Sequence, residues 1–95
     1  MIKEIGFWED SIYIIEEKKF LFKKKEHNTK INLSKISKIE RIVEHNILVG
    51  IVLWHNDIVL HAIGVKNYEK SLQDVYDMMI NNLKGSSIEF TRTEL

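Results

Sequence analysis

The sequence predicts an α+β fold that is mainly β, an antiparallel barrel or sandwich of six to seven strands capped by one C-terminal amphipathic helix. Three observations lead to this prediction. Residues 47–65 form a nearly unbroken apolar hairpin. Residues 67–84 have apolar side chains spaced three and four apart, which places them on one stripe of a helix. The segments before them are strand-like, and a single helix with one apolar stripe needs a sheet to pack against.

The N-terminal part of the chain is expected to form short strands joined by charged turns. Two segments rich in isoleucine and aromatic residues precede a predicted turn at residues 16–18. In residues 19–25 the aromatic side chains of Phe20 and Phe22 alternate with Lys19, Leu21 and Lys23. This period of two predicts that the two phenylalanines face the core. The pattern indicates a hairpin with one solvated face.

The phase of the apolar pattern changes once in the middle of the chain. Residues 26–29 are typical of a turn, and the apolar positions of residues 31–39 shift in the way that a β-bulge or a short helical turn would produce. A further strand is predicted at residues 37–44.

Two polar dipeptides divide the apolar half of the chain into a meander of three strands. His45 and Asn46 are expected to turn the chain into residues 47–54, and Asn56 and Asp57 are suited to a type I′ turn. The strand that follows should end near residue 65.

The predicted helix has recognisable ends. Asn67 belongs to the residue types that favour the N-cap, and Gly85 stands where a left-handed residue commonly terminates a helix. Residues 87–93 alternate again, and residues 86–95 are expected to form an edge strand or a tail. Residues 1–95 are thus predicted to be a single domain, with strands within about residues 5–65 and the helix at about residues 67–84.

Composition limits the possible functions. The 14 basic and 14 acidic side chains cancel, so net charge gives no support for nucleic-acid binding. The chain has no cysteine, which leaves neither disulfides nor thiolate metal ligands. It has no apolar run of the roughly 18 residues that a spanning helix needs, and its first residues do not resemble a signal peptide. We therefore expect a soluble, cytoplasmic protein.

The order of these segments resembles the pleckstrin-homology-like superfamily, including its GRAM and bacterial branches. The resemblance rests on residues 12–15 and 20–22, on residues 31–40, which look like the loop into the second sheet, and on the C-terminal helix. It implies a non-catalytic domain that binds proteins, peptides or inositol lipids. The chain departs from the lipid-binding members at the first two turns, because it has acidic residues where they have basic ones.

Positive charge is concentrated in one part of the sequence. Residues 18–41 contain nine basic and two acidic side chains, a local excess of seven. An anionic membrane surface or an inositol phosphate is one possible ligand, and a solvated sheet edge protected by lysine is the alternative. The aromatic residues of this region are expected to face the core, so a base-stacking surface is not predicted. The candidate residues for an anionic ligand are Lys18, Lys19, Lys23, Lys24 and Lys25.

No residue pattern supports catalysis, a metal site or a cofactor. His55 and His61 flank one turn and His45 lies at the turn before it, so the length of a strand should keep the three from sharing an ion. The sequence contains no nucleophile elbow, glycine-rich phosphate loop or zinc-protease motif. We expect no catalytic residues, no metal ligands and no cofactor.

The central hairpin is apolar on both faces, although a strand with one wet face should alternate. Either a second layer covers both faces, or one face is a contact surface for a second copy or another protein. The preferred prediction is a non-catalytic, self-associating interaction module, with binding of anionic lipid as the alternative and a small enzyme as a third hypothesis. The candidate interface residues are Ile47, Val49, Ile51, Leu53, Trp54, Ile58 and Leu60.

Overall fold

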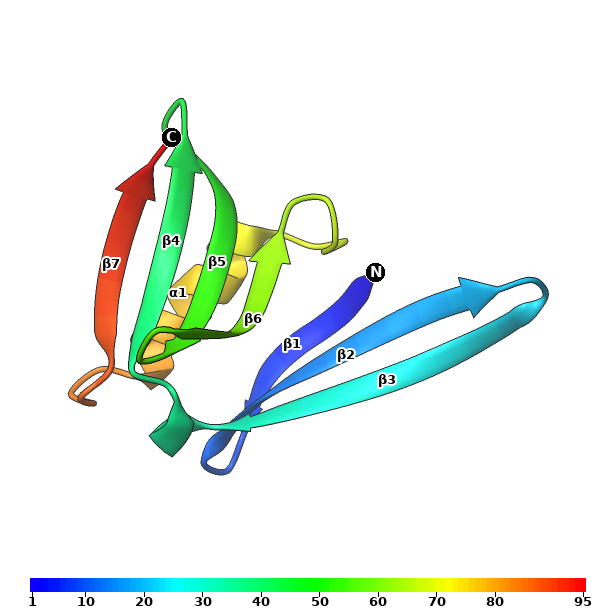
Figure 1. Ribbon diagram of the computed structural model, residues 1–95, viewed down its shortest axis with the longest axis horizontal. Coiled ribbons are helices and arrows are strands. Elements are labelled where there is room, and N and C mark those ends of the chain that lie inside the picture. Colours follow the sequence, from blue (N-terminus) through cyan, green and yellow to red (C-terminus); the bar gives the residue numbers. More distant parts are fainter.

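The computed structural model describes residues 1–95 and contains seven strands in two sheets, with one α-helix (Figure 1). The mainly β, α+β class predicted from the sequence is confirmed, but the two sheets are not closed into a barrel. The helix is too short and too polar to cross a membrane. The elements are β1 (Ile2–Trp8), β2 (Ser11–Phe20), β3 (Lys23–Asn32), the 3-10 helix η1 (Leu33–Lys35), β4 (Lys38–Glu44), β5 (Ile47–His55), β6 (Ile58–Gly64), α1 (Leu72–Asn82) and β7 (Glu89–Glu94).

The first sheet has the order β1-β2-β3 and the second has the order β6-β5-β4-β7. All pairs of neighbouring strands are antiparallel except β4 and β7, which are parallel. The prediction of a purely antiparallel arrangement was therefore wrong for the last strand. α1 carries the chain from β6 at one edge of the second sheet to β7 at the other, and a crossover of this kind allows parallel pairing.

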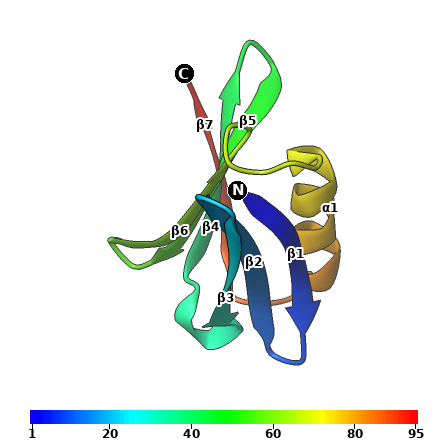
Figure 2. The same cartoon turned by 90° about the vertical axis from the view of Figure 1, so that its right-hand side faces the viewer.

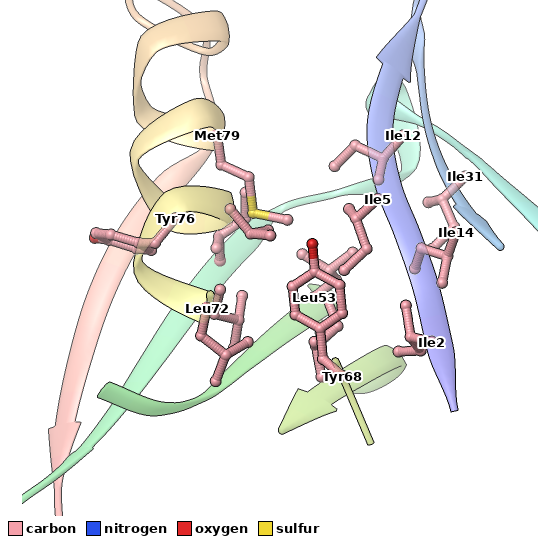
Figure 3. Close-up of a cluster of buried hydrophobic side chains, with 14 of the residues drawn as sticks. Ile2, Ile5, Ile12, Ile14, Ile31, Leu53, Tyr68, Leu72, Tyr76 and Met79 are labelled. Atoms are coloured by element: carbon pink, nitrogen blue, oxygen red, sulfur yellow. The ribbon is translucent and has the colours of Figure 1, made fainter. Parts of the chain in front are cut away.

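One hydrophobic core joins the two sheets and the helix (Figure 3). α1 lies behind β4 and β5 in Figure 1 and beside β1 in Figure 2, so it contacts both sheets. Its apolar stripe supplies Leu72, Val75, Tyr76 and Met79, which are all buried. The core consists of Ile2, Ile5, Ile12, Ile14, Ile31, Ile36, Ile39, Ile51, Leu53, Ile63, Tyr68, Leu72, Val75, Tyr76, Met79 and Leu83.

Several local predictions are confirmed. The meander of β4, β5 and β6 turns at the two predicted polar dipeptides, where His45, Asn46 and Asn56 have positive φ angles. The change of phase in the middle of the chain is the 3-10 helix η1. Gly85 has a φ of +79°, as expected for a left-handed residue after the helix.

The predicted start of the helix was wrong by four residues. The N-cap is Ser71, whose hydroxyl accepts a hydrogen bond from the Asp74 amide at 3.2 Å. Asn67 instead closes the turn after β6, because its side-chain oxygen accepts a 2.6 Å hydrogen bond from the Gly64 amide. The backbone of residues 67–69 bonds to Ile2 and cannot enter the helix there.

We expect Ser71→Ala to lower the free energy of unfolding by about 1 kcal/mol, because the first turn of α1 then loses its side-chain acceptor. Urea unfolding measures this change. Ser87→Ala is the matched control, since Ser87 is exposed and its side chain has no hydrogen bond. Equal stability of the two variants would show that the cap contributes nothing.

Candidate functional site

The hairpin of β2 and β3 extends far beyond the rest of the molecule (Figure 1). Pairing of β1 with β2 ends at the Ile2–Glu16 pair, whereas β2 and β3 remain paired as far as Phe20 and Lys23. We call residues 17–26 the arm. The turns predicted at residues 16–18 and 26–29 were wrong, because β2 and β3 continue through them and the chain reverses at Leu21 and Phe22.

The end of the arm is a cluster of three large apolar side chains, which we call the tip: Phe20, Leu21 and Phe22. Phe20 is 75% exposed, Leu21 is 84% exposed and Phe22 is fully exposed. The predicted core position of the two phenylalanines was wrong, because at this distance from the body no second layer covers either face of the hairpin. The tip exposes apolar surface that a soluble monomer would normally bury.

The turn at the tip has an unusual composition. The other hairpin turns of the chain use polar residues such as Asn56 and Asp57, which tolerate turn geometry well. Here the turn consists of Leu21 and Phe22, and Leu21 has a φ of +55°. A branched apolar residue in the left-handed region costs on the order of 1 kcal/mol. Strain of this kind, together with apolar exposure, is typical of a functional site.

A collar of lysines surrounds the tip. In the β2–β3 register Lys18 lies opposite Lys25 and Lys19 lies opposite Lys24, so two consecutive rungs carry like charges. Such pairs are destabilising, because the ammonium groups repel each other across the strands. The full collar is Lys18, Lys19, Lys23, Lys24 and Lys25, all exposed, and only Lys24 has a carboxylate within ion-pair distance, that of Glu17 at 4.0 Å.

Negative charge begins behind the collar. Glu17 lies opposite Glu26 on the rung after the Lys18–Lys25 pair. Along the arm the order is therefore apolar tip, then cationic collar, then acidic rung. The structure brings all five predicted lysines together around one exposed apolar end.

The candidate residues of the central hairpin divide between the core and the surface. Ile51 and Leu53 are completely buried in the core, so they are not available as a contact surface. The other five candidates remain partly or fully accessible: Ile47 and Ile58 are exposed, and Val49, Trp54 and Leu60 are half-buried. A second layer, formed by α1 and the first sheet, therefore covers one face of the hairpin and not both, and we call the uncovered side the open face.

A polar cluster occupies part of this open face. The Trp54 indole nitrogen donates a 3.1 Å hydrogen bond to a carboxylate oxygen of Glu40, and the Thr93 hydroxyl donates to the other oxygen. The Lys38 ammonium group lies 4.8 Å from the centre of the Trp54 ring. These hydrogen bonds, first that of Thr93, outweigh partial burial and lower the pKa of Glu40 below its ordinary value of 4.5.

The low pKa of Glu40 predicts a dependence of stability on pH. Its carboxylate is more acidic in the folded chain than in the unfolded chain, so its contribution is complete above about pH 5 and is lost as the pH falls through the folded pKa. Urea unfolding between about pH 6 and pH 3 should therefore show a smaller loss of stability in Glu40→Gln than in the unmodified protein. Identical pH profiles would contradict the assignment.

The histidines do not form a common site. The Nδ1 atom of His55 lies 2.6 Å from the Lys35 carbonyl oxygen, and the Nε2 atom of His61 lies 3.7 Å from a carboxylate oxygen of Glu16. No group of three or more histidine or acidic side chains is close enough to hold a metal ion. A hollow of about 340 Å³ on the outer face of the first sheet is open and lined by Trp8, Ser11, Tyr13, Ile15, Asn28, Thr29 and Lys30.

Sequence reasoning identified the collar but missed the tip. Alternation alone placed Phe20 and Phe22 in the core. The signal that identifies them as exposed is the near-symmetry of residues 18–25, in which paired lysines flank a central apolar triplet on both sides. A hairpin with Leu21 and Phe22 as its two-residue turn pairs these lysines across the strands and leaves the triplet at its end.

No protein-family model, curated protein or solved structure matches this chain.

Proposed function

We propose that this protein is a non-catalytic module that docks end-on to anionic membranes through its arm. The tip enters the boundary between headgroups and acyl chains, and the collar contacts the phosphate layer. The observation that carries the proposal is the position of three exposed apolar side chains inside a ring of five lysines. Each feature alone has a cost in water, and an anionic bilayer relieves both.

The energetics favour a membrane over a purely electrostatic partner. A lysine near an anionic leaflet contributes about 1 kcal/mol, and apolar side chains buried in the interface add to it. Stable attachment to a membrane generally needs two contributions of this kind, here one electrostatic and one hydrophobic. The arm provides both, and the acidic rung of Glu17 and Glu26 limits how far it enters.

The proposal agrees with the cytoplasmic location expected from the sequence, since the cytoplasmic leaflet carries the anionic lipids. A relationship to the pleckstrin-homology-like superfamily remains a proposal as well. It is supported by the order of the first six strands and the helix after them. The parallel β7 and the open sheets are not part of that resemblance.

Co-sedimentation with vesicles tests the proposed function. The protein should bind vesicles of phosphatidylcholine mixed with phosphatidylserine and should not bind phosphatidylcholine alone. The double variant Phe20→Ser/Phe22→Ser should lose roughly a hundredfold in affinity, because each benzyl group contributes about 1.5 kcal/mol or more when buried. Val65→Ser, at another exposed apolar residue, is the control and should bind normally. Failure to bind the mixed vesicles would overturn the proposal.

Self-association through the open face of the second sheet is a second candidate function. It is favoured by the exposure of Val59 (47%), which pairs across the strands with the half-buried Trp54. Sedimentation velocity should then show a dimer that Val59→Glu converts to a monomer. A monomer at every concentration of the unmodified protein would exclude this candidate.

A further inference from the structure

The lysines of the collar do not converge on one point. Paired residues of an antiparallel ladder project to the same face, and successive rungs alternate between faces. Lys18 and Lys25 therefore lie on one face of the arm, and Lys19 and Lys24 lie on the other. The ammonium groups surround the ribbon, so one small headgroup cannot contact all of them.

The arm also lacks a pocket suited to a polyphosphorylated headgroup. A hollow that reaches Lys18 and Lys19 is also lined by Glu17 and Glu69. Lys3, in the same hollow, is already paired with Glu69 at 2.6 Å. The two carboxylates repel a ligand with several negative charges.

Building on the proposed function, we propose that the arm recognises the charge density of an anionic bilayer and not a single lipid headgroup. Monoanionic lipids such as phosphatidylserine are then sufficient ligands, because several of them can gather around the collar at once. Each lysine should contribute about fivefold to the affinity, largely independently of the others.

Vesicles of equal total charge test this inference. One set contains phosphatidylserine and the other contains phosphatidylinositol bisphosphate, each mixed with phosphatidylcholine. We expect affinities that agree within about threefold. Soluble inositol hexakisphosphate should displace the protein no better than sodium chloride of the same ionic strength. A preference of about tenfold or more for the phosphoinositide, or displacement by the soluble headgroup, would overturn the inference.

Two matched lysine variants locate the contact. Lys23→Gln, in the collar, should reduce affinity for both kinds of vesicle about fivefold. Lys3→Gln, in the hollow, should leave both affinities unchanged, and a selective loss of phosphoinositide binding in this variant would contradict the inference. Absence of binding to both kinds of vesicle is the distinct result that rejects the proposed function, and this inference falls with it.

Discussion

Replacing Lys18 and Lys25 together by glutamine is expected to weaken binding to anionic vesicles about thirtyfold. Each lysine near the bilayer contributes about 1 kcal/mol, and 2 kcal/mol corresponds to that factor. The two residues lie opposite each other in the collar, and neither forms an ion pair within the protein. Co-sedimentation at fixed ionic strength measures the change.

The same double variant should not destabilise the fold. It removes a like-charge pair, so the free energy of unfolding should stay the same or rise by a few tenths of a kcal/mol to about 1 kcal/mol. Weaker binding with equal or greater stability is the signature of residues kept for a ligand. Lys30→Gln/Lys35→Gln, with both lysines exposed outside the arm, is the control for net charge. An equal loss of binding in the control would show that the position of the charges does not matter.

Leu53→Ala is expected to lower the free energy of unfolding by roughly 3 kcal/mol. Leu53 is completely buried in the core between the two sheets and α1, where truncation leaves a cavity that the packed neighbours cannot fill (Figure 3). Ile58→Ala, in the same hairpin but 64% exposed, should change stability by less than about 0.5 kcal/mol. Urea unfolding of both variants measures the difference.

Comparing the stability of Leu53→Ala with that of Ile58→Ala tests which residues of the central hairpin belong to the core and which lie at the surface. If Leu53→Ala were as mild as Ile58→Ala, the buried position of Leu53 would be contradicted. A large effect of Leu53→Ala with no effect on oligomeric state would confirm that this residue supports the fold and not an interface.

The sequence predicted the architecture where local chemistry and packing agree. The three-strand meander follows from polar turns such as Asn56 and Asp57 between apolar runs, and the C-terminal helix follows from its apolar stripe. The start of the helix was misplaced because Asn67 and Ser71 are both good N-caps. The choice between them depends on backbone pairing with Ile2, which is 65 positions away from Asn67 in the sequence.

The candidate site at the end of the arm was predicted only in part, for a physical reason. Alternation reports which residues share a face, but it does not report whether a second layer covers that face. The five lysines were recognised by their charge, whereas Phe20 and Phe22 were assigned to a core that does not extend so far. Likewise, the alternation could not show that Leu53 is buried and Trp54 remains partly accessible, because this depends on which face of the central hairpin α1 covers.

Fluorescence depth measurement on anionic vesicles tests the central claim most directly. Phe22→Trp should show a blue-shifted emission that is quenched by lipids brominated in their acyl chains. Trp8 is paired with Ser11, nine positions from Phe20 along β2, or about 30 Å from the tip. The emission of Trp8 and Trp54 in the unmodified protein should therefore not change on binding. Quenching of those native tryptophans, with no shift in Phe22→Trp, would contradict end-on docking through the arm.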